Sequence, residues 1–485
     1  MREDIQKTKL EKLENIKKAG MEPYPEKTEK NMTSAEALEK FSEFSGDKKE
    51  IILAGRIKSF RLMGNIAFAH AEDGTAKIQF FLNKKVLDAE KFKLFVGSVE
   101  AGDFVEARGI LFETKAGEKS LEVHNWKMLS KNIRPIPTEY FGLKDEEMLL
   151  RKRYLDLMMN PETRELFRKK NIFWQAIRNY LSDAGFLEVQ LPVMEHIPGG
   201  AEAEPFITHH NALDQDFYLR ISLELPLKKL LVGGYEKVFE IGRVFRNEGI
   251  DREHLQEFDN TEFYWAYGDL DKGIELVKKL YKKIVFDVLG SYQHKFEEGI
   301  IDWENDFPIV DYFTEFQKET GIDLNQKITV EELKKKADDL GIKYETGYSK
   351  GRMIDTLYKK TVRQKMVQPC FLTGHPVEVS PLAKKDPNNS KKVRRVQVIA
   401  GRSELGNGWA EINDALDQRS RFEEQAKLRE AGDKEAQMFD EDFVEALEYG
   451  MPPAFGFGMG ERFFAFIMNK SVRECVIFPA MKNKE

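Results

Sequence analysis

Hydrophobic residues recur with helical spacing in the first twenty positions, where Leu10, Leu13 and Ile16 precede a stretch that contains Pro23 and Pro25. Apolar residues three and four positions apart lie on one face of a helix, and prolines end such a pattern. The sequence therefore predicts a short amphipathic helix. Its apolar face packs against a neighbouring domain, while its many lysines leave contact with a nucleic-acid backbone open as an alternative.

A different pattern follows between residues 51 and 129, where short apolar runs are separated by glycines: IILAGRIKSF, NIAFAHAED, AKIQFFLN, DFVEARGILFET and KSLEVHNWKML. Five short strands in a module of this length are typical of an oligonucleotide-binding (OB) β-barrel, whose exposed aromatic and polar side chains bind unpaired bases. The sequence predicts an arm over residues 1–45 and the barrel over 46–135. Candidate base-binding residues are Phe60, Arg61, Phe68 and Gln79, although a core role for Phe68 and a surface role for Gln79 stay open.

The proline-punctuated segment NIRPIPTEYFGLKD leads into a second domain, expected over residues 136–485. It begins with the helical pattern RELFRKKNIFWQAIRNYLSDAG, passes to the strand-like GFLEVQLPVM, and continues as strands with helices near 270–290 and 330–365. This order predicts an α+β domain with a mainly antiparallel sheet. The segment KKDPNNSKKVRR (384–395) is expected to be an exposed basic loop, with an RNA-binding or nucleotide-lid role as the alternative.

Composition narrows the classes of function. The chain has 76 basic and 83 acidic residues, so a nucleic-acid partner requires local basic patches rather than net charge. Cys370 and Cys475 stand far apart without CxxC spacing, which argues against a zinc site and against a disulfide framework. No apolar run approaches the roughly 20 residues that span a bilayer. We therefore expect a soluble cytoplasmic protein without a membrane or DNA partner.

Neither GxxxxGK[ST] nor a strand-associated GxGxxG occurs, so phosphate binding must rest on other groups. The segment EKVFEIGRVFRNEGIDREHLQEFDNTEFYWAY (236–267) contains FRNEG followed by HLQEF and EFY, and it resembles motif 2 of class II aminoacyl-tRNA synthetases. The resemblance implies that Arg246 binds the amino-acid carboxylate and the α-phosphate of ATP, since its planar fork suits paired oxygens. By the same resemblance Glu248 contacts the adenine amino group, Phe258 stacks on the adenine, and His254 lies near the distal phosphates.

Two further segments extend the resemblance. GFGMGERFFAFIMN (456–469) looks like motif 3, in which Arg462 clamps the γ-phosphate and the glycines let backbone approach the nucleotide. GFLEVQLPVM (185–194) is similar to motif 1, which implies an obligate homodimer with Pro192 ending a strand at the interface. Matches such as RYLDLM and QPCFLTGHPVEVSPLAK spread the similarity over nearly the whole chain.

The segment GRSELGNGWAEINDALDQ (401–418) resembles the signature GNGxxELNDxxDQ of the lysine enzymes in this family. A lysine ammonium needs buried carboxylates and an aromatic or hydroxyl companion. The resemblance implies a pocket in which Glu224 and Glu411 bind the ε-ammonium and Tyr264 hydrogen-bonds to it. The remaining implied pocket residues are Glu262 and Asn407, which orient the α-amino and carboxylate end, and Trp409, which lines the wall.

The same segment implies a magnesium site for the β- and γ-phosphates. Glu404 matches the acidic ligand, but Gln397 stands where many relatives have a second acidic residue, and an amide is a poorer magnesium ligand than a carboxylate. The number of ions is therefore left open.

Together these features predict an enzyme that activates lysine with ATP and esterifies it to tRNA(Lys) by positioning and charge stabilisation, without a general base. In the barrel, SFRLMGNIAF and KIQFF resemble the family's anticodon-binding domain, which implies that Phe68 and Gln79 bind the anticodon. Two alternatives are kept. One is the same chemistry on aspartate or asparagine, and the other is a related protein that lysylates another protein and no longer binds tRNA.

Overall fold

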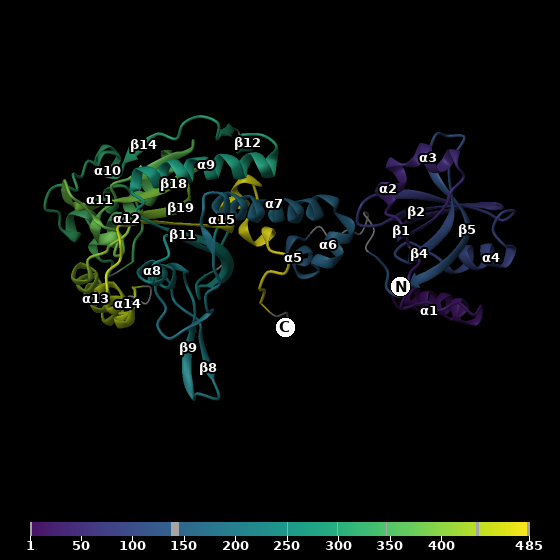
Figure 1. The fold of residues 1–485 in the computed structure, drawn as a ribbon, viewed down its shortest axis with the longest axis horizontal. Helices are drawn as coiled ribbons and strands as arrows, with labels where there is room; N and C mark the ends of the chain where they lie inside the picture. Colours follow the sequence, from purple (N-terminus) through teal and green to yellow (C-terminus); the bar gives the residue numbers. More distant parts are fainter. Residues whose placement is uncertain are drawn as a thin grey trace. The chain divides into compact units, whose positions relative to one another are not determined.

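The chain divides between residues 144 and 145 into two units, each with a hydrophobic core of its own. A computed structural model describes residues 2–136, 145–249, 251–297, 299–345, 347–432 and 436–482 (Figure 1). The expected limits of the arm and the barrel, at residues 45 and 135, stay a prediction. Residues 137–144, at the expected proline-rich connection, lie outside the described residues.

The first unit is a closed five-stranded barrel preceded by three helices, which confirms the predicted OB-type barrel. The strands pair in the order β1-β2-β3-β5-β4, and α4 lies between β3 and β4 in the chain. The elements are α1 (Arg2–Lys18), α2 (Ser34–Glu39), α3 (Phe41–Gly46), β1 (Glu50–Met63), β2 (Ile66–Glu72), β3 (Lys77–Asn83), α4 (Ala89–Ser98), β4 (Phe104–Glu113) and β5 (Lys119–Ser130).

Helix α1 confirms the predicted amphipathic helix, but its buried stripe differs from the expected one. Leu13 and Ile16 are buried, whereas Leu10 is 43 % exposed and its neighbour Lys9 is buried instead. Residues 9, 13 and 16 follow the i, i+4, i+7 spacing of one helix face. The expectation for Leu10 was therefore wrong, because an ion pair of Lys9 takes the position that an apolar side chain was expected to fill.

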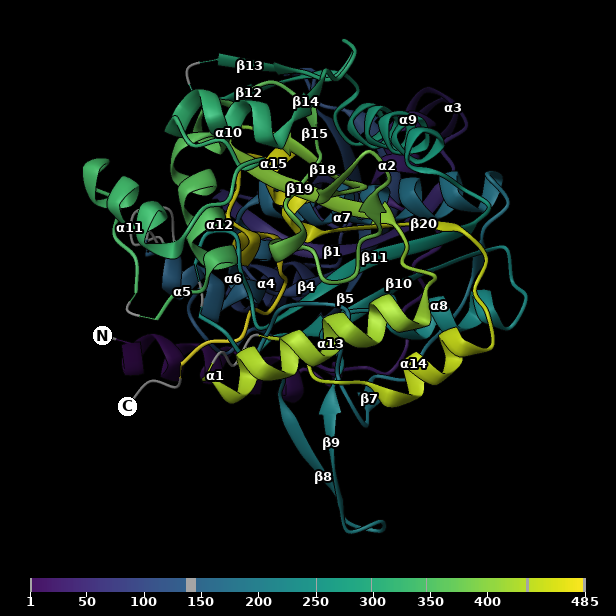
Figure 2. The same cartoon turned by 90° about the vertical axis from the view of Figure 1, so that its left-hand side faces the viewer.

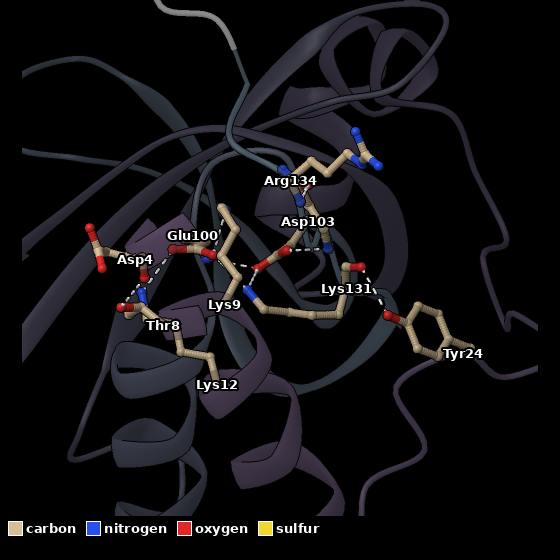
Figure 3. Close-up of polar contacts among 10 residues, drawn as sticks. Asp4, Thr8, Lys9, Lys12, Tyr24, Glu100, Asp103, Lys131 and Arg134 are labelled. Carbon is tan, nitrogen blue, oxygen red and sulfur yellow. Dashed lines mark hydrogen bonds and ion pairs between the residues drawn. The ribbon is translucent and has the colours of Figure 1, made fainter. Parts of the chain in front are cut away.

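That ion pair belongs to a cluster that fastens α1 to the end of the barrel (Figure 3). The ammoniums of Lys9 and Lys131 donate to Glu100 Oε1 at 2.6 and 3.0 Å, and Lys12 donates to Oε2 at 2.8 Å. Lys131 also donates to Asp103 Oδ2 at 2.8 Å, and both of these side chains are fully buried. Burial alone raises the pKa of Glu100, but the three ammoniums outweigh it and hold that pKa at about 2.

The second unit is built on an eight-stranded sheet that is antiparallel except where β14 joins β15 and β10 joins β6. This confirms the predicted α+β fold with a mainly antiparallel sheet. In spatial order the strands are β14 (Ile309–Asp311), β15 (Cys370–Thr373), β18 (Arg395–Ala400), β19 (Ser403–Ala410), β20 (Ala454–Gly460), β11 (Glu257–Ala266), β10 (Lys237–Phe245) and β6 (Leu187–Glu188).

Helices cover the two faces of this sheet as separate layers. Phe263 and Phe457 point to a core with α7 (Pro161–Asp183), α9 (Leu270–Leu289) and α15 (Glu461–Ile467), whereas Tyr264 points to a core with α8 (Glu224–Val232), α13 (Ala415–Glu430) and α14 (Glu441–Glu448). Successive residues of a strand face opposite sides, so Phe263 and Tyr264 serve different layers. Figure 2 shows α13 and α14 below the strands and α9 above them.

The remaining elements surround the sheet. The three strands β7 (Met194–Glu195), β9 (Gln215–Leu219) and β8 (Ile207–His210) form a small sheet that projects downward in Figures 1 and 2. The helices predicted near 330–365 are α11 (Val330–Asp339) and α12 (Lys350–Thr361). The other elements are α5 (Glu146–Arg151), α6 (Arg153–Met159), α10 (Tyr312–Thr320), β12 (Gln293–Phe296) and β13 (Gly299–Asp302).

Two local predictions were wrong. The basic segment 384–395 is not a plain loop, because β16 (Lys385–Asp386) and β17 (Asn389–Val393) form a hairpin in it. Pro192 does not end a strand, since it lies between β6 and β7. None of the helices among the described residues combines the length and apolarity needed to cross a bilayer.

The ion cluster of the first unit generates a stability prediction. We expect Lys131→Met to lower the free energy of unfolding of the barrel by about 3–5 kcal/mol, because it leaves the carboxylate of Asp103 buried without its cation. Hydrogen exchange in increasing urea, followed by mass spectrometry on peptides from β4 and β5 of the whole protein, measures the effect.

Two variants control this prediction. Lys93→Met, on an exposed position of α4, should change the stability by less than about 0.5 kcal/mol. Adding Asp103→Leu to Lys131→Met should recover much of the loss, because both members of the buried pair are then apolar. Equal stability of Lys131→Met and the wild type would contradict the prediction.

Candidate functional site

A single cavity of about 660 Å³ in the second unit collects most of the residues singled out in the sequence. It opens on the sheet face that carries Tyr264, and its walls come from α8, β11, β18, β19, β20, α12, α13 and α15 and from the loop between β10 and β11. The predicted residues that line it are Glu224, Arg246, Glu248, His254, Phe258, Glu262, Tyr264, Gln397, Glu404, Asn407, Trp409 and Arg462. Glu411 lies behind this lining, and Phe68 and Gln79 belong to the other unit.

The pairing of β11 with β20 explains why glycines accompany the charged residues. Asn260, Glu262 and Tyr264 alternate along β11 and share one face, and they stand opposite Gly460, Gly458 and Gly456. A Cβ at Gly456 would lie 2.2 Å from Glu411 Oε1 and 2.3 Å from the ring of Tyr264. The glycine-rich strand therefore leaves space for the carboxylates and the tyrosine.

Arginines form the anion-binding part of the cavity. Arg246 follows β10, donates from Nε to the carbonyl of Ile221 at 3.2 Å, and lies 5.2 Å from the centre of the Phe258 ring. Burial lowers the pKa of this guanidinium. A guanidinium enclosed in this way gains from an anionic ligand that replaces its lost water.

The loop between β10 and β11 folds back onto the second arginine. Arg462 donates to His254 Nε2 at 2.8 Å, and the other ring nitrogen of His254 bonds to Asp251 at 2.7 Å. A second hydrogen bond holds this loop, in which Ser403 Oγ donates to Glu253 Oε1 at 2.5 Å. Arg462 also donates to the backbone carbonyl of Glu404 at 3.3 Å, so His254, Arg462 and Glu404 form one corner of the cavity.

The acidic end of the cavity lies on the wall formed by α8 and β11. Glu262 accepts four hydrogen bonds, from Ser222 Oγ, the backbone N–H of Leu223, Asn260 and the Tyr264 hydroxyl. These donors orient it and satisfy its charge. Glu224 and Glu411 are almost fully buried, and burial raises their pKa values to about 8 and about 7.

Sequence reasoning missed two residues of the site. Lys228 on α8 places its ammonium 2.5 Å from both Glu224 and Glu411, and its side chain is fully buried. Arg395 on β18 donates to the side-chain oxygen of Asn407 at 2.9 Å and lies 5.7 Å from the Trp409 ring. The i, i+4 spacing between Glu224 and Lys228 was a visible signal for the first of them.

The expected metal ligands meet at the edge shared by β18 and β19. Glu404 and Gln397 both line the cavity, and the side-chain oxygen of Gln397 is buried without a hydrogen-bond partner. No cluster of three His, Cys, Asp or Glu side chains suited to a metal was found within the described part of the chain. One carboxylate and one amide oxygen fit a magnesium ion that takes its remaining ligands from water and phosphates.

On the barrel, the candidate base-binding residues divide between two faces. Phe68 on β2 lies 5.3 Å from Phe81, which lies 5.3 Å from Phe112, and these rings stand on the outer face. Gln79 shares that face but is only 6 % exposed, since it donates to Glu118 and accepts from Ser120. Phe60 is partly buried and packs against the barrel core, 5.9 Å from Phe95, and its role in base binding stays a prediction.

Comparison with known proteins supplies the wider context. Residues 145–482 match the family of class II tRNA synthetases (D, K and N), and residues 51–129 match the OB-fold nucleic acid binding domain. A lysine–tRNA ligase of Halalkalibacterium halodurans is 41 % identical over 489 residues, which cover 99 % of this chain and 97 % of the relative. A lysine–tRNA ligase of Syntrophomonas wolfei is 41 % identical over 481 residues, which cover 99 % of this chain and 97 % of the relative. A lysine–tRNA ligase of Bacillus subtilis is 38 % identical over 488 residues, which cover 99 % of this chain and 98 % of the relative.

These matches agree with the architecture of both units, an OB barrel and an antiparallel sheet whose cavity carries arginines at one end and carboxylates at the other. They span nearly the full length of the chain and of its relatives. The chain belongs to the family of class II tRNA synthetases.

Proposed function

We propose that the protein is a lysine–tRNA ligase, which activates lysine with ATP and transfers it to the 3′ end of tRNA(Lys). The observation that carries the proposal is the pair of buried carboxylates, Glu224 and Glu411, next to a cavity that also holds Arg246 and Arg462. A site of this kind accepts an ammonium at one end and phosphates at the other.

In the first step a carboxylate oxygen of lysine attacks the α-phosphorus of ATP, and the bond to pyrophosphate breaks. Arg246 binds the lysine carboxylate and the α-phosphate, and Arg462 binds the γ-phosphate beside His254. Phe258 and Glu248 hold the adenine. The enclosure of Arg246 and the short contact of Arg462 with His254 support these roles. Arginines fixed before the reaction stabilise the charge that develops on the phosphoryl oxygens.

In the second step the terminal ribose hydroxyl of the tRNA attacks the carbonyl carbon of lysyl-adenylate and AMP leaves. No side chain becomes covalently attached, and positioning supplies the rate enhancement. Magnesium, when bound by Glu404 and the phosphates, neutralises charge on the pyrophosphate that leaves. Gln397 is expected to contribute at most a neutral oxygen to that ion.

The substrate amino acid is selected by the acidic wall. Glu224 and Glu411 bind the ε-ammonium with Tyr264, while Glu262 and Asn407 orient the α end and Trp409 closes the side. An aspartate side chain would meet three carboxylates in this pocket, which disfavours the aspartate alternative by charge repulsion. The presence of the OB barrel disfavours the alternative of a protein-modifying relative that no longer binds tRNA.

We further propose that the enzyme is a homodimer that works in the cytoplasm. Exposed apolar residues flank Pro192 and continue onto β8 and the turn that follows it, as expected of a surface that a second copy covers; they are Leu187, Val193, Met194, Ile207 and Leu213. Both cysteines are free and buried, which suits a reducing compartment.

Amino-acid-dependent pyrophosphate exchange tests the function. We expect exchange with lysine alone among the twenty amino acids. Glu411→Gln should raise the KM for lysine by about 100-fold, or ~3 kcal/mol, because the variant loses one charge of the buried pocket. Glu423→Gln, at an exposed position of α13, should leave exchange unchanged. Exchange with aspartate or asparagine would overturn the choice of substrate.

The raised pKa values of Glu224 and Glu411, about 8 and about 7, generate a pH prediction. A carboxyl group with a raised pKa is neutral at low pH and then cannot pair with an ammonium. We therefore expect the KM for lysine to increase as the pH falls below about 8, by up to about tenfold per pH unit for each carboxyl group that becomes protonated, while the KM for ATP changes little. Exchange rates between pH 6 and pH 8.5 measure both constants, and a KM for lysine that is constant over this range would contradict the prediction.

The barrel generates a prediction about tRNA. We expect Phe68→Ala to raise the KM for tRNA(Lys) by about 5-fold to 100-fold, the loss of one stacked base at ~1–3 kcal/mol, and to leave pyrophosphate exchange unchanged. Val86→Ala, an exposed apolar position just after β3, is the matched control and should behave as the wild type. Unchanged charging kinetics of Phe68→Ala would exclude this residue as an anticodon contact.

A further inference from the structure

The acidic pocket already contains an ammonium that belongs to the protein. Lys228 Nζ lies 2.5 Å from Glu224 Oε1 and 2.5 Å from Glu411 Oε2, and the Lys228 side chain has no solvent-exposed surface. A buried lysine is stable only when its charge is fully paired. Burial alone lowers the pKa of Lys228, but the two carboxylates outweigh it and leave that pKa above its usual value.

Residues from four parts of the chain surround the Lys228 ammonium. Helix α14 presents the ring of Phe443 at 5.7 Å, and β11 presents the ring of Tyr264 at 5.9 Å. The charged and titratable groups that face this cluster are Glu224 from α8, Glu411 from the residue after β19, and Tyr264 and Glu262 from β11. Among the described residues, Lys228 is the one cationic side chain that pairs with Glu224 and Glu411.

The two oxygens of Glu411 have different surroundings. Oε2 is bound by the Lys228 ammonium and by Trp409 Nε1 at 3.0 Å. Oε1 is buried without a hydrogen-bond partner and lies against Gly456, where an added Cβ would come within 2.2 Å of it. An unpaired carboxylate oxygen is costly in a buried site unless a ligand completes it. Lys228 thus occupies the inner side of the pair and leaves an acceptor on the side of Gly456.

Charges in the pocket balance only when both ammoniums of a lysine substrate are present. Glu224, Glu262 and Glu411 carry three negative charges when ionised, and Lys228 neutralises one of them. The α- and ε-ammoniums of lysine neutralise the other two, while the lysine carboxylate is met by Arg246 in the proposed reaction. A neutral side chain in the pocket leaves one buried carboxylate without a partner.

We propose that Lys228 is a specificity-determining positioning residue, an internal counter-ion that favours the ionised forms of Glu224 and Glu411 so that the pocket binds one further ammonium. This inference rests on the proposed function. Lys228 does not contact the reacting atoms, and it acts through the two carboxylates. Without Lys228, the two buried carboxylates repel each other, and one of them takes up a proton instead of binding the substrate.

The test compares Lys228→Met with the wild type in lysine-dependent pyrophosphate exchange from pH 6.5 to pH 9. We expect the KM for lysine at pH 7 to increase by more than tenfold, and the acidic limb of its pH profile to move up by at least one pH unit. At pH 9 the KM should approach that of the wild type, because the carboxyl groups ionise there without help. The kcat at saturating lysine should stay within about threefold of the wild type.

The neighbouring Lys229 provides a matched control on the same helix. Its ammonium pairs with Asp442, and both side chains are partly or largely exposed. Lys229→Met removes one lysine from α8 but leaves the buried cluster intact, so it should keep the pH profile of the wild type. Thermal unfolding of all variants shows whether a change in KM accompanies loss of the fold.

A second variant keeps the inference falsifiable if Lys228→Met does not fold. Lys228→Ala removes three carbons and the ammonium, so added propylammonium matches the missing atoms. We expect propylammonium to lower the KM for lysine of Lys228→Ala at pH 7, and to act on the wild type only as a weak inhibitor. Such rescue requires a charge at this position and is not expected of a purely structural role.

The outcomes are distinct. Three results would overturn the role of Lys228 while lysine-dependent exchange by the wild type stands. They are an unshifted pH profile for Lys228→Met, a change in that variant confined to kcat, and failure of propylammonium to restore Lys228→Ala. Absence of lysine-dependent exchange in the wild type would instead overturn the proposed function, and the inference with it.

Discussion

Burial of three carboxylates at one end of the cavity, two in its wall and one behind it, is the constraint on which the second unit depends. Glu224, Glu262 and Glu411 are each at most 5 % exposed, and an ionised carboxylate in such surroundings must be given donors or a cation. The fold provides both. Four donors surround Glu262, and Lys228 lies between the other two.

The sheet makes this arrangement possible by separating polar and apolar side chains between its two faces. The period of two along β11 sends Phe263 into the core with α7 and α9, while Glu262 and Tyr264 face the cavity. The glycines of β20 then leave room directly opposite these side chains. Side chains at Gly456 and Gly460 would clash with Glu411 and Asn260, so the strand could not keep these residues in place without the glycines.

Much of this organisation could be predicted from the sequence, because strand periodicity, glycine spacing and the FRNEG segment are local signals. What escaped prediction depends on contacts between distant residues. Lys9 replaced Leu10 on the buried face of α1 because Glu100, ninety-one positions away, pairs with it. The alternative of an ordinary surface role for Gln79 was wrong, because Glu118 and Ser120, about forty positions away at the start of β5, bond to it and leave it only 6 % exposed. The segment ELPLKK does not distinguish Lys228 from its neighbour Lys229, because Glu411, which pairs with Lys228, is distant in the sequence.

The two buried lysines show how similar ion pairs serve different ends. Lys131 joins Glu100 and Asp103, whose carboxylates also accept bonds from Lys9, Lys12 and the backbone N–H of Asn132 (Figure 3). That cluster is completed by the protein itself and fastens a helix to a barrel. Around Lys228 one oxygen of Glu411 is buried without a hydrogen-bond partner and lies against Gly456, which lines the cavity. The first arrangement stabilises a fold, whereas the second has one cation for two carboxylates, and this excess of negative charge is the basis on which the proposed pocket selects an amino acid with an ammonium side chain.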